Sequence, residues 1–207
     1  MNGCGLVEII MALPLALLLG SCVATAPVGP ADRDGKADRG VSVAGLGAPV
    51  DVEFRASLDQ STQRYVKMLP KGFDSRKPHD LLIALHGQGS DRWQYVKEDR
   101  GECRGARDVA ARHGLIFVSP DYRGPMAGMN SQAEADLLQI IALMRQEYKI
   151  GKVFLAGGSM GGVSVLLFAA SHPELVHGVV SANGTALANT RVDKGCLSRN
   201  ETVNAAW

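Results

Sequence analysis

The sequence has little net charge, few cysteines and no metal-binding pattern. Lysine and arginine exceed aspartate and glutamate by one among 207 residues, so the formal net charge is +1. That balance gives no reason to expect a nucleic acid or a polyanionic substrate as partner. The four cysteines have no spacing typical of a metal site, and nothing indicates a cofactor. No repeats occur, and a hydrophobic content of 46% predicts one globular domain with a sizeable core.

The first apolar run is too short to span a bilayer. Residues 9–19 form an apolar run that Pro14 interrupts, and the last residue of the run begins the tetrad Leu19-Gly20-Ser21-Cys22. This arrangement indicates a signal peptide. The ending resembles the lipobox of bacterial lipoproteins, and the resemblance implies an exported, periplasmic or outer-surface protein anchored in the membrane by lipid on Cys22. The segment before the run holds Glu8 and no lysine or arginine, so an ordinary secretory signal with an incidental Cys22 remains the alternative.

Three segments follow from composition. Residues 1–21 are the expected lipoprotein signal peptide, and residues 22–49, rich in Ala, Gly, Pro, Asp and Arg without apolar periodicity, are expected to be a flexible tether. Residues 50–207 are expected to form the folded domain. An oxidising compartment permits a disulfide between Cys103 and Cys196, which their separation along the chain does not decide.

Apolar patterning in the domain alternates between strand and helix. Expected strands are 50–58, 63–69, 81–85, 115–119, 153–156 and 176–182, and expected helices are 104–113, one opening with a capping box at Ser131–Glu134, and one after residue 160. The first strand would place Val50, Val52, Phe54, Ala56 and Leu58 on one face, and the first helix would turn Ala106, Val109 and Ala110 inward. Two antiparallel strands followed by strand and helix units predict a mostly parallel α/β sheet flanked by helices. We expect the edge of the last strand to be unpaired.

The stretch that organises the domain is VFLAGGSMGGVSVLLFAA, residues 153–170. A buried strand passes through glycines into a helix, with Ser159 at the apex, which is the pattern of a nucleophile elbow. Gly157 and Gly161 supply the positions that must lack side chains. The alternatives are a serine that only caps the helix and a phosphate-binding loop; the second is disfavoured because no Lys-Ser/Thr pair follows.

Other suggestive residues follow the strands at the same sheet edge. His86, Gly87 and Gln88 follow residues 81–85, Asp121-Tyr122-Arg123 follow residues 115–119, and Asn183 follows residues 176–182. Ligands of parallel sheets bind at this carboxyl edge.

Four segments together resemble the α/β-hydrolase superfamily. YVKMLPKGFD (65–74), LHGQG (85–89), PDYRG (120–124) and GGSMGG (157–162) are similar to secreted esterases of the polyhydroxybutyrate depolymerase and feruloyl esterase type, and to the catalytic domain of prolyl oligopeptidase-like enzymes. The resemblance implies an exported serine hydrolase without cofactor or metal, most simply a carboxylesterase acting on a small-molecule or polymer ester. It does not identify the substrate or the oligomeric state.

The resemblance also implies site roles. Ser159 would be the nucleophile, and the backbone amides of Met160 and Gln88 would form the oxyanion hole. His86 would shape the oxyanion turn instead of acting as base, and His86, Gly87, Tyr122 and Arg123 could line the pocket, with bracing as an equal possibility for the last two.

The family pattern is incomplete in this sequence. An acid and then a histidine should follow the nucleophile, but His172 and His177 lie too close to the elbow, and Asp193 is a weak candidate for the acid. We therefore expect the triad Asp and His beyond Trp207 and poor activity of the chain as given. A peptidase of the prolyl oligopeptidase-like type and a non-catalytic hydrolase-fold lipoprotein remain alternatives.

Overall fold

A computed structural model describes residues 9–10 and 45–184, and these form one mixed sheet. Its strands run in the order β1-β7-β6-β4-β5-β3-β2. Their bounds are β1 Ile9–Ile10, β2 Val50–Arg55, β3 Thr62–Met68, β4 His79–Leu85, β5 Ile116–Pro120, β6 Ile150–Gly158 and β7 Gly178–Ala182. The hairpin β2–β3 is antiparallel and joins β5 antiparallel, while β4, β5, β6 and β7 are mutually parallel. The mostly parallel α/β sheet predicted from the sequence is confirmed.

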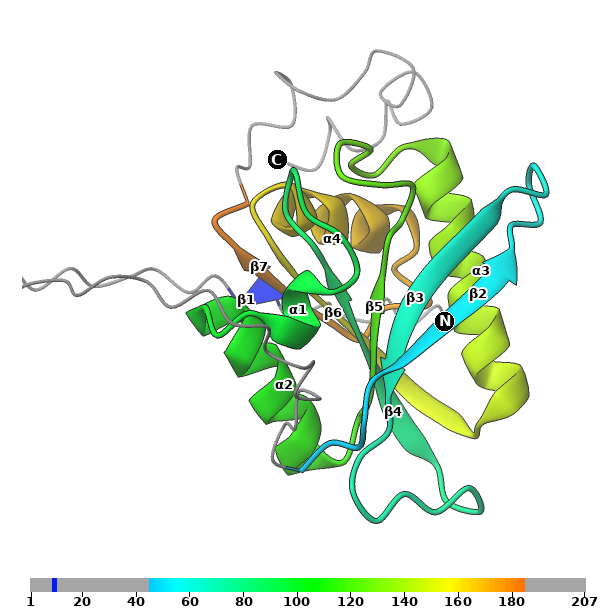
Figure 1. The fold of residues 1–207 in the computed structure, drawn as a ribbon, viewed down its shortest axis with the longest axis vertical. Helices are drawn as coiled ribbons and strands as arrows, with labels where there is room; N and C mark the ends of the chain where they lie inside the picture. The colour runs from blue at the N-terminus through cyan, green and yellow to red at the C-terminus, as the bar shows by residue number, and fades with distance from the viewer. Residues whose placement is uncertain (1–8, 11–44, 185–207) are drawn as a thin grey trace, which may run out of the picture.

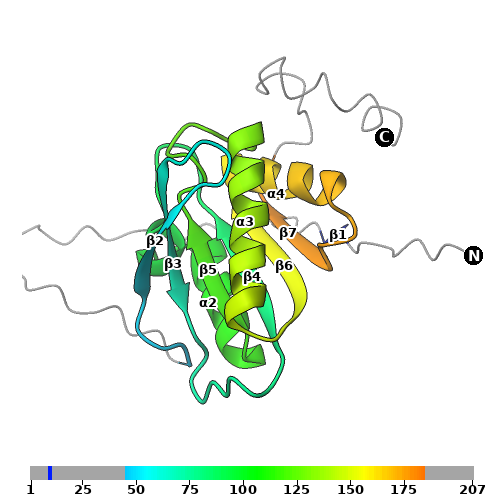
Figure 2. The ribbon, with the colours of Figure 1, turned by 90° about the vertical axis from the view of Figure 1, so that its right-hand side faces the viewer.

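Helices cover both faces of this sheet. They are α1 Gln94–Lys97, α2 Gly101–His113, α3 Ser131–Glu147 and α4 Met160–Ser171. Figures 1 and 2 show α1 and α2 on one face and α3 and α4 on the other. The central strands β4 and β5 are consequently buried on both sides, which explains their continuous apolar sequences.

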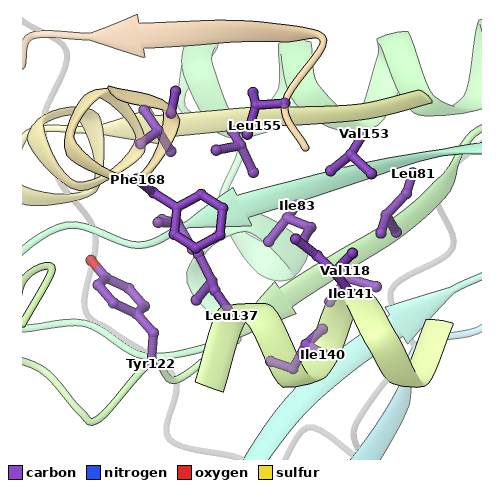
Figure 3. Packing of buried hydrophobic residues seen from close by; sticks show 14 of the residues in the cluster. Leu81, Ile83, Val118, Tyr122, Leu137, Ile140, Ile141, Val153, Leu155 and Phe168 are labelled. Carbon is purple, nitrogen blue, oxygen red and sulfur yellow. The ribbon is translucent and has the colours of Figure 1, made fainter. Parts of the chain in front are cut away.

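The sheet divides the buried apolar residues into two clusters. One lies between the sheet and α3 and α4, and Figure 3 shows Leu137 and Phe168 meeting Ile83 and Leu155 there. The other lies between the sheet and α1 and α2 and includes Tyr95 and Cys103. Both clusters reach the carboxyl ends of β4 and β6, so this end of the sheet is packed from both sides.

Three local expectations need correction. Asn130, not Ser131, caps α3: its side-chain oxygen accepts from the amides of Gln132 and Ala133, and an asparagine outside the helix offers the same bonds as the expected serine. Val109 on α2 is 45% exposed, because it faces away from the sheet. Val50 and Leu58 are exposed as well: Val50 begins the edge strand β2, and Leu58 lies in the turn after it, because β2 ends at Arg55 and not at residue 58 as expected.

The folded part of the chain starts before Val50. Leu46 is buried in the cluster under α1 and α2 and pairs with Pro70 in an isolated antiparallel bridge. Gly45 accepts a hydrogen bond from Lys71 through its carbonyl. The last residues of the expected tether 22–49 are therefore part of the domain.

The edge of β7, expected to be unpaired, carries β1. Ile9 and Ile10 align in parallel with Val179 and Val180. These two residues come from the segment interpreted as the signal peptide, so removal of residues 1–21 would also remove β1 from the sheet.

None of the helices within the described residues is both long and apolar enough to cross a membrane. Cys22, Asp193 and Cys196 lie outside the described residues. Cys103 is buried and has a free thiol.

Candidate active site

Ser159 stands at the turn between β6 and α4 in a backbone conformation that side chains rarely adopt. Its φ is 55° and its ψ is −118°, a strained combination for a residue other than glycine. The Ser159 amide donates to the carbonyl of Ala182 at 2.9 Å, which ties the turn to the end of β7. The turn leaves Ser159 exposed directly after the end of β6, as expected of a nucleophile elbow.

The two glycines flanking the serine have no room for a side chain. A Cβ on Gly157 would lie 2.3 Å from the carbonyl oxygen of Gly161, and a Cβ on Gly161 would lie 2.1 Å from the carbonyl oxygen of Leu85. Both obstacles are backbone atoms and cannot rotate away. The structure therefore gives the physical reason for glycine at these two positions.

The loop after β4 lies directly beside Ser159. A Cβ built on Gly87 would be 3.4 Å from the carbonyl oxygen of Gly158 and 3.7 Å from the Cβ of Ser159. The Gly87 amide donates to Oε1 of Gln94 at 2.7 Å, and Gln94 is buried on α1. Helix α1 thus holds this loop against the elbow.

Two backbone amides of the site loops have no hydrogen-bond acceptor within residues 45–184. Met160 is the first residue of α4, so its amide has no acceptor within the helix and stands at the positive end of the helix dipole. The Gln88 amide donates to no described backbone or side-chain acceptor. Gln88 directly follows Gly87, whose Cβ position lies 3.7 Å from the Ser159 Cβ.

A pocket opens at this point. It has a volume of about 90 Å³, well below the roughly 300 Å³ and more of sites for drug-sized ligands, so it fits a small group. Its described lining residues are Gly87, Gln94, Tyr95, Arg100, Glu102, Gly158, Ser159 and Asn183. Of the residues singled out from the sequence, Gly87, Ser159 and Asn183 line it.

His86 lies behind the wall of the pocket. It is fully buried, its Nδ1 is 2.8 Å from the carbonyl oxygen of Gly87, and its Nε2 is 3.1 Å from the carbonyl oxygen of Asp121. Both ring nitrogens thus face backbone carbonyls of the site loops. This arrangement supports shaping of the oxyanion turn by His86 and leaves no nitrogen directed at Ser159.

Tyr122 and Arg123 brace loops instead of lining the pocket. The buried Tyr122 hydroxyl donates to the carbonyl of His86 at 2.6 Å, and Figure 3 shows the ring beside the apolar cluster. Arg123 donates to Asp59 at 2.6 Å and to Asp136 at 2.7 Å, which joins the β2–β3 turn to α3. Burial raises the pKa of Asp136, and the hydrogen bond from Arg123 opposes that rise.

Three of the other four histidines are engaged elsewhere. His172 contacts Glu134, His177 accepts from the amide of Val153, and His79 faces the carbonyls of Asp74 and Gly114. His113 is the last residue of α2. Across residues 45–184 no histidine lines the pocket. The pocket lining within these residues therefore offers Ser159 no histidine.

Reasoning from the sequence missed the wall that α1 and α2 contribute. Tyr95 and Glu102 face the pocket across Gly158. Helix α1 has four residues, too few to show a helical period. The sequence therefore indicated only that this segment follows the LHGQG loop, and not that it forms a wall of the pocket.

With this geometry in view, residues 80–199, more than half of the chain, match the family model described as alpha/beta hydrolase fold. The chain belongs to this family. Among curated proteins, feruloyl esterase C of Emericella nidulans is 32% identical to this α/β hydrolase over 84 residues, which are 41% of this chain and 30% of the relative.

Solved structures share the fold. A CE1 ferulic acid esterase from Anaeromyces mucronatus, in complex with ferulic acid, superposes with a TM-score of 0.53 at 19% identity, covering 68% of this chain and 58% of that chain. A fluorophosphonate-binding serine hydrolase from Staphylococcus aureus superposes with a TM-score of 0.53 at 23% identity, covering 65% of this chain and 56% of that one. This α/β hydrolase spans less than two thirds of each relative.

Proposed function

We propose that the protein is a carboxylic ester hydrolase in which Ser159 is the nucleophile. The observation that carries the proposal is the strained Ser159 at the apex of a strand, turn and helix, beside an open pocket and two available amides. The serine oxygen would attack the ester carbonyl, and the amides of Met160 and Gln88 would bind the developing oxyanion. The family membership and the esterases of the same fold support this reaction class.

The base that takes the serine proton is assigned to residues outside the described part of the chain. His86 is the nearest alternative in sequence, but its two nitrogens face carbonyls of the loops that it holds. Without a base the serine hydroxyl is a weak nucleophile, and loss of the histidine from such a triad costs several orders of magnitude in rate.

A fluorophosphonate probe tests the nucleophile. We expect a version of the chain extended through an acid and a histidine to label strongly at Ser159, and Ser159→Ala to abolish labelling. Ser164→Ala is the matched control, because Ser164 lies on the same helix with its hydroxyl donating to the carbonyl of Met160. Labelling that persists in Ser159→Ala would refute the assignment, and rapid labelling of the 207-residue chain would return His86 to consideration as the base.

Substrate panels separate the esterase from its two alternatives. We expect nitrophenyl esters to be hydrolysed and aminoacyl amides to be left intact by the extended protein. Preferential cleavage of the amides would favour the peptidase related to prolyl oligopeptidases. Binding of esters without turnover and without labelling would favour a non-catalytic role.

We also propose export and anchoring through Cys22. The support is the Leu19 to Cys22 tetrad after a short apolar run, and lipidation together with a tether would hold the domain at a membrane surface. Cell fractionation of Cys22→Ala tests it: the variant should leave the membrane fraction. A wild-type protein that is already fully soluble would refute the anchor.

A further inference from the structure

The pocket beside Ser159 contains a buried hydroxyl group without a partner. Tyr95 is 1% exposed, and within residues 45–184 its hydroxyl makes no hydrogen bond. Burial raises the pKa of Tyr95, so the group is a neutral hydroxyl that can donate. An unpaired buried hydroxyl is unfavourable because it has lost its hydrogen bonds to water, so its persistence in a folded protein calls for an explanation such as a bound group.

Tyr95, Glu102 and Gly158 line the pocket together. A Cβ on Gly158 would lie 3.3 Å from the Tyr95 hydroxyl oxygen and 3.7 Å from Oε1 of Glu102, so these two oxygens lie close to the same point of the pocket wall. The wall beside Gly158 therefore holds a donor and an acceptor that one small group in the pocket can contact. Because Gly158 immediately precedes Ser159, that group would be close to the reacting carbonyl.

The charges around the space decide which chemistry fits. Arg100 pairs at 2.5 Å with Glu98 and stands 3.7 Å from Glu102, so its charge is directed mainly to Glu98. No described residue donates a hydrogen bond to the Glu102 carboxylate. The pocket therefore presents a negative acceptor, which disfavours an anionic substituent, and a neutral donor, which an alkyl group would leave unpaired.

We propose that this pocket binds a hydroxyl group of the ester substrate, which accepts a hydrogen bond from Tyr95 and donates one to Glu102. This deepens the proposed function, on which it rests, by naming a substrate class: esters that carry a hydroxyl close to the reacting carbonyl. The volume of about 90 Å³ is suited to such a small group. Tyr95 and Glu102 would then determine specificity without taking part in the chemical step.

Binding is tested on the full chain carrying Ser159→Ala, so that no turnover interferes. Methyl glycolate and methyl propionate have the same number of heavy atoms and differ by a hydroxyl in place of a methyl group. We expect NMR titration to show methyl glycolate binding at least about tenfold more tightly, as one neutral hydrogen bond and one to a carboxylate allow. Tyr95→Phe should lower this preference, because only the hydrogen bond to Glu102 then remains, and should leave the affinity for methyl propionate unchanged.

Two further variants test the proposal: one that narrows the pocket and one control. Gly158→Ala places a methyl group in the same space, 3.4 Å from the Glu102 Cγ, and should weaken methyl glycolate specifically. Tyr148→Phe is the matched control: the Tyr148 hydroxyl bonds Lys67 and Glu147 before the start of β6, whereas the pocket lies at the end of that strand, so its loss should leave the preference intact. Equal affinity of the two esters, or a Tyr95→Phe variant with the same preference as the parent chain, would overturn the proposal.

An assay of ester hydrolysis distinguishes failure of the hydroxyl pocket from failure of the proposed esterase function. The extended protein with Ser159 intact is assayed with both esters in a pH-stat. Hydrolysis of both at equal rates, with equal binding, would overturn the hydroxyl pocket and leave the esterase standing. Selective binding that depends on Tyr95, with neither hydrolysis nor probe labelling, would overturn the esterase and support the pocket.

Discussion

The ion pair between Arg123 and Asp136 offers a sharp test of how the site loops are held. Both side chains are almost fully buried, at 8% and 2% exposure, and Arg123 also binds Asp59 and Ser61 on the β2–β3 turn. The variant Arg123→Met keeps most of the stem and removes the charge. It would leave Asp136 as an uncompensated charge inside the protein.

The expected cost is large. Removing one partner of a buried pair costs about 3–5 kcal/mol, and for a protein of this size about 2–4 °C of melting temperature is lost per kcal/mol, so Arg123→Met should melt roughly 6–20 °C lower. Urea and thermal unfolding followed by circular dichroism measure this. Arg104→Met is the matched control: Arg104 and Asp108 form an exposed pair one helical turn apart, worth about 0.3–0.5 kcal/mol.

A second variant and the pH dependence test whether the buried ion pair stabilises the protein. In Arg123→Met/Asp136→Leu no unpaired charge remains, and most of the lost stability should return. Burial already raises the pKa of Asp136 above 3.8. A carboxyl with a raised pKa in the folded state costs stability in full above that pKa, and the cost declines as the pH falls through it and is gone below the unfolded-state pKa, so the deficit of Arg123→Met should shrink as the pH falls. A single variant within about 1 kcal/mol of wild type, or a double variant no more stable than the single one, would show that the pair is not the brace.

Three further predictions concern other parts of the chain. Ser159→Gly should have a free energy of unfolding roughly 1–2 kcal/mol higher than Ser159→Ala, because only glycine adopts a φ of 55° without strain. Equal free energies of unfolding would remove the argument for strain. The hydrogen bond from Arg92 lowers the pKa of Asp51 from 3.8, so the ionised Asp51 stabilises the fold at neutral pH, and this stabilisation is lost as the pH falls from about 5 through the lowered pKa. Asp51→Asn should therefore reduce the loss of unfolding free energy at acid pH by less than about 1 kcal/mol. An unchanged acid dependence would contradict the assignment. Burial raises the pKa of the Cys103 thiol to about 11, so peptide mapping after iodoacetamide at pH 8 should find Cys103 unmodified in the folded chain and modified in urea, whereas rapid modification of the folded chain would show that the thiol is accessible.

The strands and the elbow could be predicted because their signals are local. Continuous apolar runs mark β4, β5 and β6, and the glycines on either side of Ser159 mark the turn within a few residues. The cap of α3 was misplaced by one residue because Asn130 and Ser131 are equally good capping residues. The sequence alone does not show which of two adjacent capping residues stands at the N-cap, because that depends on where the backbone enters the helix.

The pocket wall and the brace could not be predicted because they depend on contacts between distant segments. Arg123 meets Asp59 across 64 residues. Tyr95 and Glu102 lie beside Gly158 only because α2 packs against β6 and α1 against α2. The edge of β7 shows the same limit, since its partner β1 comes from the opposite end of the chain. Periodicity describes which face of an element is apolar, not which other element covers it.

The backbone contacts at Gly157 and Gly161 have a consequence for anyone who redesigns the protein. Most tight spots in a core yield to a compensating change, because a neighbouring side chain can be made smaller. Here the obstacles are the carbonyl oxygens of Gly161 and Leu85, which every amino acid carries, so no second mutation restores the space. Libraries that vary these two positions would yield sequences that cannot form this turn. Gly158, whose Cβ would meet side chains, and Gln88, exposed on its loop, are positions in these loops where variation can leave the turn intact.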